Sequence, residues 1–321
     1  MLSGIKYWRA GLLDQMNPPK PTFGVDQIPD LSGHVAIVTG GGAGIGYETS
    51  KALLQHHAKV YLCTRDQGKA ERAIVRLKAE VGKDCQVIFV QLDLANLKSV
   101  KRAATELAAR EHEVHILINN AGVMWSALDA LTDDGYDMQF GTNVIGHFLF
   151  TELLMPVLLA GARASPDGHT RVVTVSSLAA YNTGEVWYDA LRDGPTRRKL
   201  GTEKLYDQSK FANAVVARQI AQRYGEQGIV SISLNPGAIK TDLQRTMNPI
   251  ARRIVQAALF PPTMGALTSL FAATMPEALN YNGEFMVPWA RLGKCRQEMY
   301  DDSLGQKLWE RLEDETKTFR D

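Results

Sequence analysis

The 321-residue sequence predicts an α/β protein, a single domain built on a doubly wound parallel sheet with helices on both faces. Short apolar runs rich in β-branched residues alternate with longer segments of helical periodicity, which is typical of a sheet covered on both sides. A glycine-rich turn follows the first run, and later runs end in Asn, Ser or Pro-Gly. Ligands of such sheets bind beyond the carboxyl ends of the strands, so these residues predict a binding edge.

The strands and helices can be placed from residue 34 onward. We expect strands at 34–40, 59–65, 85–94, 114–122, 171–177 and 229–237. We expect helices at 45–57, 66–80, 99–111, 136–159 and 206–224. The expected domain spans 33–295, after an irregular Pro-rich leader over 1–32 and before a helical tail over 296–321.

Composition narrows the classes of function. The 36 basic and 35 acidic residues nearly cancel, which argues against a nucleic-acid partner. Cys63, Cys85 and Cys295 fit neither a disulfide framework nor a metal cluster, so we expect reduced thiols, a cytoplasmic protein and no metal. The apolar stretch 144–162 contains His147 and Pro156, which favours a buried helix over a membrane span.

The turn TGGGAGIG, residues 39–46, lies between the first strand and the first helix. Glycine lets the backbone turn tightly against a pyrophosphate, and the helix N-terminus attracts that anion, so the turn predicts a dinucleotide-binding Rossmann fold. The second strand ends in Thr64-Arg65, where an NAD enzyme would place Asp or Glu. Arg65 favours NADP(H) over NAD(H), because a guanidinium binds the extra phosphate; the alternative is an ordinary solvated arginine.

The ordered motifs resemble the short-chain dehydrogenase/reductase family. They are TGGGAGIG (39–46), Asp93-Leu94, NNAG (119–122), Asn143, Ser177, YDQSK (206–210) and PGAIKT (236–241), and the match covers roughly residues 33–290. Within the family the chain looks similar to the retinol-dehydrogenase-like branch, which has a comparable VYLC-TRD strand end and a long insertion before the Tyr.

The resemblance implies a role for each cofactor-binding position. Gly40, Gly44, Ile45 and Gly46 would line the pyrophosphate, while Asp93 and Leu94 would meet the adenine. Asn120, Ala121 and Gly122 would flank the adenosine, and Pro236, Gly237, Ile239 and Thr241 would meet the nicotinamide half.

Tyr206 and Lys210 form the expected catalytic pair, since positions four apart share one face of a helix. The ammonium would lower the pKa of the phenol and hold the nicotinamide ribose, so that Tyr206 exchanges a proton with the substrate oxygen. By resemblance Ser177 would bind that oxygen, and Asn143 would anchor a water linking Lys210 to solvent. The alternatives are a buried ring with a snorkelling Lys, strand-end serines with Ser176 at the site, and a structural Asn.

Ser177 and Tyr206 are 29 positions apart, which predicts an insertion over 181–205 beside the site. Its Trp187, Tyr188 and Leu191 would wall a pocket, and its basic run Arg197-Arg198-Lys199 is interpreted as solvated surface. An apolar segment at about 241–265 would form a lid over a lipophilic substrate, with peripheral membrane contact as the alternative use.

The sequence therefore predicts an NADP(H)-dependent oxidoreductase that interconverts a carbonyl and an alcohol on a lipophilic small molecule, with reduction favoured. The competing hypothesis is a catalytically silent NADP(H)-binding regulatory or scaffolding protein on the same fold. Members of the resembled family commonly dimerise or tetramerise through the helices that carry Asn143 and Tyr206, whereas the retinol-dehydrogenase-like insertion often goes with monomers, so both a homodimer and a monomer stay open. In a homodimer Phe148, Leu149, Leu153 and Leu154 would form the interface, and otherwise they would fill the core.

Overall fold

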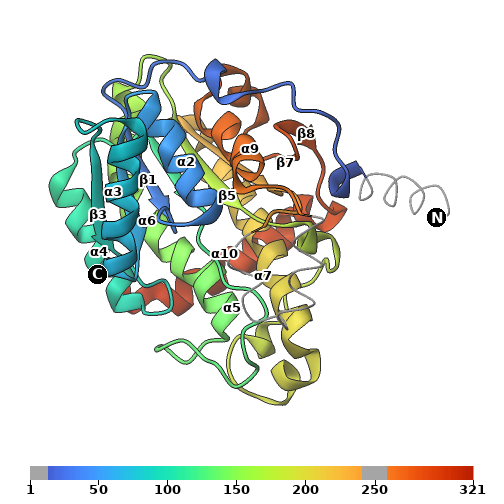
Figure 1. Ribbon diagram of the computed structural model, residues 1–321. Helices are drawn as coiled ribbons and strands as arrows, with labels where there is room; N and C mark the ends of the chain where they lie inside the picture. Colours follow the sequence, from blue (N-terminus) through green and yellow to red (C-terminus); the bar gives the residue numbers. More distant parts are fainter. Residues whose placement is uncertain (1–13, 241–258, 321) are drawn as a thin grey trace.

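The computed structural model describes residues 14–240 and 259–320, and these form one eight-stranded sheet with helices on both sides (Figure 1). The strand order is β3-β2-β1-β4-β5-β6-β7-β8; β1 to β7 are parallel and β8 is antiparallel. The strands are β1 Val35–Thr39, β2 Lys59–Thr64, β3 Val87–Gln91, β4 Ile116–Asn119, β5 Thr170–Val175, β6 Ile229–Leu234, β7 Phe285–Val287 and β8 Arg291–Gly293. The predicted doubly wound class is confirmed.

Two groups of helices cover the two faces of the sheet. The helices are α2 Gly44–Gln55, α3 Gln67–Val81, α4 Leu97–Arg110, α5 Met138–Phe140, α6 Gly146–Ala164, α7 Pro195–Tyr224, α9 Pro262–Thr274 and α10 Asp302–Arg320. One hydrophobic cluster unites the sheet with α4, α6, α7 and α10, and a second unites it with α2, α3 and α9. Apolar burial on both faces is what the nearly continuous apolar strands predicted.

Two helices differ from the sequence expectation. The helix that carries Tyr206 begins at Pro195, with proline in its first turn, and bends at Gly201, where φ is 73°. Much of the expected insertion 181–205 is therefore the first part of α7. Helix α9 begins at Pro262, inside the segment expected as a lid, and the sequence reading did not anticipate it.

The segment before β1 packs along the sheet instead of standing apart from it. Phe23, Ile28 and Leu31 are buried in the cluster on the α2 and α9 side, and the ring of Phe23 meets Phe271 edge-on at 5.3 Å. The segment includes one short 3-10 helix, Val25–Gln27. Figure 1 shows this blue segment running from near β8 across that side of the molecule.

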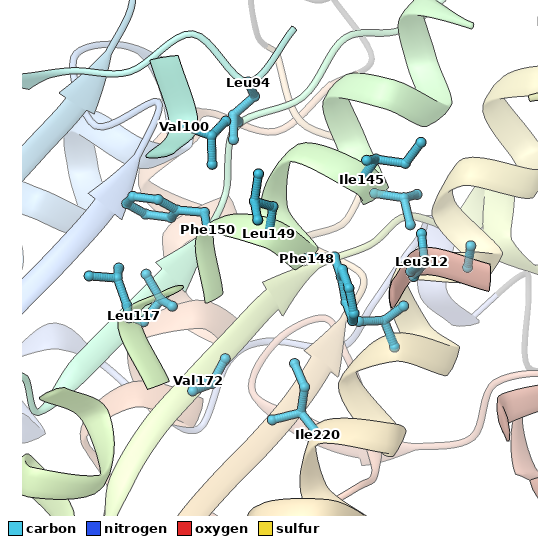
Figure 2. Packing of buried hydrophobic residues seen from close by; sticks show 14 of the residues in the cluster. Leu94, Val100, Leu117, Ile145, Phe148, Leu149, Phe150, Val172, Ile220 and Leu312 are labelled. Atoms are coloured by element: carbon cyan, nitrogen blue, oxygen red, sulfur yellow. The ribbon is translucent and has the colours of Figure 1, made fainter. Parts of the chain in front are cut away.

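The long apolar helix lies in the core. Residues 138–164 form a helix that is apolar and long enough to cross a membrane. However, 67% of its 18-residue apolar stretch is buried inside the fold. Figure 2 shows Phe148, Leu149 and Phe150 packed among side chains of the sheet and of α10. Helix α10 covers this face, with Trp309 meeting Phe148 edge-on at 4.9 Å. Phe148, Leu149 and Leu154 thus fill the core of the chain, which was the alternative to an interface.

Candidate functional site

The carboxyl ends of β1, β4, β5 and β6 bring the motif residues to one edge of the sheet. The strand order reverses between β1 and β4, and this switch point is where open α/β sheets leave a crevice for ligands. Gly40 follows β1, Asn120 follows β4, Ser177 lies two residues beyond β5, and Pro236 lies two residues beyond β6.

The glycine turn after β1 has the geometry of an anion cradle. Gly40 and Gly44 have φ of 67° and 53°, a region that disfavours side chains. A Cβ on Gly46 would clash with the Gly40 carbonyl oxygen and lie 2.6 Å from Asn120 Nδ2. Helix α2 has Ala43 as its N-cap, without a side-chain cap bond, and carries no acidic residue in its first turn. Its free N–H groups and positive dipole end suit a pyrophosphate.

Thr39, which the sequence reading left without a role, ties β4 to β1 beside this turn. Its hydroxyl oxygen accepts hydrogen bonds from the backbone N–H groups of Asn120 and Ala121, both at 2.9 Å. The Asn120 side chain donates back to the Thr39 carbonyl at 2.8 Å. These hydrogen bonds therefore fix the ends of β1 and β4, which would flank the adenosine, relative to each other.

The adenine-side residues are spread along the same edge. Asp93 follows β3 and accepts a hydrogen bond from the Ala95 N–H at 3.0 Å. The Leu94 side chain packs in the core, and the half-buried Ile45 side chain packs against Gly265 of α9. Arg65 follows β2 and is exposed, and it forms no ion pair with any residue in 14–240 or 259–320.

Tyr206, Ser177 and Lys210 come together at the end of β5. Ser177 lies close enough to the Tyr206 phenol to lower its pKa, whereas the buried Ser176 hydroxyl donates to the Lys210 carbonyl at 2.6 Å. The structure thus places Ser177 at the phenol. Lys210 Nζ lies 5.9 Å from the centre of the Tyr206 ring and donates to the Val175 carbonyl at 3.0 Å.

The pKa values of this pair differ from the sequence expectation. Burial raises the pKa of Tyr206 to about 12, against a smaller lowering by the Ser177 hydrogen bond. Burial lowers the pKa of Lys210 to about 8. We expected the ammonium to lower the phenol pKa, but desolvation raises this pKa, and Lys210 Nζ is directed to the Val175 carbonyl instead of the phenol. Tyr206 is consequently a protonated donor across the neutral range.

Asn143 lies in a π-helical turn, Gly141–Ile145, that connects α5 to α6. Its side chain accepts from the Val123 N–H at 2.9 Å and donates to the Val123 carbonyl and the Ser209 hydroxyl, both at 3.0 Å. A Cβ on Gly122 would lie 3.2 Å from Asn143 Oδ1 and 3.4 Å from Lys210 Nζ, so both groups face the same space. The water expected at Asn143 stays a prediction.

Two contacts hold the turn after β6. Gly237 has φ of 91°, and a Cβ there would lie 2.9 Å from the Trp289 ring. Ile239 forms a bridge with Phe260, which brings together the two chain ends that flank residues 241–258. Thr241 and most of the expected lid lie outside the described residues.

Gln15 is a polar anchor that the sequence reading missed. Its buried amide accepts from Asn235 Nδ2 at 3.0 Å and donates to the Tyr181 hydroxyl at 3.0 Å. Asn235 in turn accepts from the Gly237 N–H at 3.0 Å. The segment before β1 therefore reaches the turns beyond β5 and β6, and no periodic pattern in the sequence signalled this contact.

The insertion matches the expected pocket wall in part. Trp187 and Tyr188 line a cavity against α10, where Tyr188 lies 5.1 Å from Lys307 Nζ to its ring centre, whereas Leu191 is fully buried in the core. The interpretation of 197–199 as solvated surface is wrong for Arg197, which is 1% exposed and pairs with Asp137 at 3.0 Å. Its guanidinium also donates to the carbonyls of Leu128 and Ala130.

No group of three or more His, Cys, Asp or Glu side chains within the described ranges is arranged to hold a metal ion. The polar groups at this edge are instead a phenol, a hydroxyl, an ammonium and backbone N–H groups beside a glycine cradle. Such a set fits a nicotinamide dinucleotide and a substrate that exchanges a proton.

Comparisons with known proteins agree with this arrangement. Residues 34–190 match the family model described as short chain dehydrogenase. A short-chain dehydrogenase/reductase of Armillaria gallica is 54% identical over 308 residues, which cover 96% of this chain and 98% of that protein. An uncharacterised Mycobacterium paratuberculosis protein of known structure has TM-score 0.70 and 27% identity, covering 92% of this chain and 97% of its own. NADPH-bound carbonyl reductase from chicken fatty liver shares the fold, with TM-score 0.62 and 23% identity over 82% of this chain and 99% of its own.

Proposed function

Because the chain belongs to the short-chain dehydrogenase/reductase family of oxidoreductases, which act on CH–OH and C=O groups, we propose that it uses NADP(H) to interconvert a carbonyl and an alcohol on a lipophilic small molecule. Reduction is the favoured direction. The observation that carries the proposal is the placement of Ser177 beside the Tyr206 phenol, with Lys210 buried 5.9 Å from the centre of that ring, at the edge that also holds the glycine turn.

The chain's own groups account for cofactor binding. Gly40, Gly44 and Gly46 leave room for the pyrophosphate against the N-terminus of α2. Lys210 Nζ faces the space beside Gly122, where it would hold the nicotinamide ribose. When bound, the nicotinamide supplies or accepts the hydride, and the protein supplies the proton, the orientation and the electrostatic environment.

Tyr206 serves as the proton donor. Its raised pKa keeps the O–H intact at neutral pH, so the phenol can protonate a carbonyl oxygen as that oxygen gains negative charge. Ser177 donates to the same oxygen and stabilises the developing charge, while the nearby ammonium of Lys210 stabilises the phenolate that remains. Alcohol oxidation needs the phenolate at the outset, which burial disfavours, and this supports reduction as the main direction.

Arg65 carries the proposed preference for NADP(H). The nearest carboxylate in sequence, Asp66, caps helix α3 by accepting from the Lys69 N–H at 2.9 Å. The exposed guanidinium is thus the ionic group offered to a phosphate at the end of β2, and a charge-assisted pair there stabilises the complex by about 1.5–3 kcal/mol.

Exposed apolar side chains in the loop after β4 support a lipophilic substrate. Trp125 and Leu128 follow β4 and are 38% and 36% exposed, large fractions for such side chains. The lid expected at about 241–265 stays a proposal, and Ile239 and Phe260, described residues on either side of 241–258, form a bridge at this edge. We propose a cytoplasmic enzyme. The alternative is an enzyme that contacts a membrane through the apolar residues at this edge, Trp125 and Leu128 among them.

Turnover tests the proposal directly. Absorbance of NADPH is followed with lipophilic aldehydes, including retinoid-like ones because of the branch resemblance, and with small polar aldehydes as controls. We expect Tyr206→Phe to lower kcat by about 1,000-fold while the Kd for NADPH stays within about three-fold. Tyr224→Phe is the matched control on the same helix, since its hydroxyl bonds Glu152 instead. NADPH binding by the unmodified protein, with no aldehyde reduced, would support the silent regulatory alternative.

Cofactor choice has its own experiment. We expect Arg65→Leu to weaken NADPH binding by at least about ten-fold and to change NADH binding little. Lys83→Leu, an exposed cation in the loop between α3 and β3, is the control for general charge. Equal losses for both cofactors in the Arg65 variant would remove the basis for the NADP(H) preference.

A further inference from the structure

A buried histidine outside the catalytic set connects the two halves of the proposed site. His147 lies in α6, directly after the π-helical turn, and is 4% exposed. Its Nδ1 is 3.0 Å from the Asn143 carbonyl oxygen, and its Nε2 is 2.9 Å from the Thr39 hydroxyl. Both ring nitrogens therefore end on groups adjacent to the cofactor edge.

Hydrogen-bond counting fixes the tautomer of this ring. A carbonyl oxygen can only accept, so Nδ1 must carry the proton that it shares with Asn143. In a neutral imidazole Nε2 is then an acceptor, and the Thr39 hydroxyl donates to it at 2.9 Å in preference to the Ile118 carbonyl, which is 3.4 Å away. The two acceptor positions of that hydroxyl remain for the N–H groups of Asn120 and Ala121, and both are within 2.9 Å.

Protonation of the ring would disrupt this arrangement. A second proton on Nε2 would point at a hydroxyl oxygen that already accepts two bonds. Burial and the nearby charge of Lys210 act in the same sense, and they lower the pKa of His147 to about 4. The geometry and the electrostatics agree on a ring that stays neutral over the working range of pH.

We propose that His147, as the neutral Nδ1–H tautomer, is a positioning residue that couples the cofactor-side backbone to the catalytic helix. Through Thr39 it orients the hydroxyl that fixes Asn120 and Ala121. Through the Asn143 carbonyl it sets the π-helical turn, whose Asn143 side chain fixes Val123 and donates to Ser209. The Ser209 hydroxyl donates to the Tyr206 carbonyl at 2.8 Å, which completes the path.

The roles assigned to the two ends rest on the proposed function, whereas the tautomer does not. The first experiment is therefore a long-range ¹H–¹⁵N NMR spectrum of the histidine rings of the full chain without cofactor, with His147 assigned by its absence in a His147→Gln variant. We expect a protonated Nδ1 and an unprotonated Nε2, unchanged from pH 8 to pH 5. An Nε2–H tautomer, or a ring that becomes doubly protonated above pH 6, would overturn the proposal whatever the enzyme's activity.

Two conservative variants then separate the two connections. In His147→Asn the amide nitrogen occupies the position of Nδ1 and keeps the bond to Asn143, while the acceptor for Thr39 is lost. In His147→Gln the amide reaches the position of Nε2 and keeps the Thr39 contact, while the Nδ1 donor is lost. We expect the Asn variant to raise the Kd for NADPH by about 3–10-fold with kcat within two-fold, since one net hydrogen bond is lost.

We expect the converse from the Gln variant, a kcat lowered about 3–10-fold and a Kd for NADPH within two-fold. Thr151→Val is the control, because it removes another buried hydroxyl of α6, the acceptor of Asn119 Nδ2 at 2.9 Å. It should lower the melting temperature and leave both Kd and kcat within two-fold. If both His147 variants only lower the melting temperature, as the control does, the residue is a core histidine and the proposal fails. If NADPH binds but no substrate turns over, the proposed function fails, and the His147 proposal is still tested. It is supported by a raised Kd for NADPH in His147→Asn together with the Nδ1–H tautomer, and contradicted if either is missing.

Discussion

The two halves of the molecule differ in how much of their packing a repeated pattern in the sequence predicts. In the cofactor half, β1–β4 with α2–α6, alternating apolar strands and helix faces build the fold, and polar bonds such as that between His147 and Thr39, 108 positions apart, are added to this frame. In the substrate half, β5–β8 with residues 14–32 and 178–205, buried polar groups join positions far apart in sequence. Gln15 and Asn235 are 220 positions apart, and Arg197 and Asp137 are 60 apart. A repeated apolar pattern therefore builds the cofactor half, whereas single polar anchors determine the shape of the substrate half.

The largest effect that tests this contrast is expected at Arg197. Arg197→Met keeps the length of the side chain but leaves the buried carboxylate of Asp137, 2% exposed at its side chain, without its cation. Breaking a buried pair in this way costs about 3–5 kcal/mol, because an uncompensated charge stays in the interior. Urea unfolding should show this loss together with a higher KM for the aldehyde, since the guanidinium also binds the carbonyls of the loop after β4.

The neighbouring arginine supplies the control. Arg198 pairs with Asp193 at 2.8 Å, but its side chain is 67% exposed, so Arg198→Met should cost well under about 1 kcal/mol. Equal costs for the two variants would mean that Arg197 is not a buried anchor, and the contrast between the halves would lose its strongest case.

A smaller effect is expected from acid in the cofactor half. The pKa of His147 is lowered from 6.5 to about 4, so the unfolded chain binds a proton there before the folded chain does. The contribution of the neutral ring is complete above pH 6.5, falls as the pH drops toward 4, and is constant below that value, for a total of about 3 kcal/mol. The free energy of unfolding of the unmodified protein, relative to His147→Leu, should follow this course in urea titrations at pH 7.5, 5.5 and 4.5.

Thr151→Val is the parallel measurement, because it keeps the histidine. Its stability should run parallel to that of the unmodified protein across the same pH values. A constant difference between the unmodified protein and His147→Leu over this range would contradict the neutral, buried ring.

The same contrast explains what the sequence could predict. Strands β1 to β6 and the helices α2 to α4 follow from local apolar periodicity, and Ser177, Tyr206 and Lys210 lie at strand and helix positions that the motifs identified. Arg197 was misread because its basic neighbours suggested solvent, while its partner Asp137 is distant in sequence. The raised pKa of Tyr206 was missed because a spacing of four residues gives proximity but not the extent of desolvation.

The smallest effect in this series is expected at Gln15, and it asks whether the segment before β1 belongs to the site. Gln15→Leu preserves volume but leaves Asn235 Nδ2 without its acceptor, at a cost of about 1–3 kcal/mol, while Tyr181 still donates to the Lys294 carbonyl. Met16→Ala, at an exposed neighbour, is the control. Asn235 also accepts from Gly237, so a loosened Asn235 should lower kcat by a few-fold at saturating NADPH. A loss of stability with unchanged kcat would mean that Gln15 only holds the segment before β1 in place. Residues 14–32 would then not belong to the substrate half.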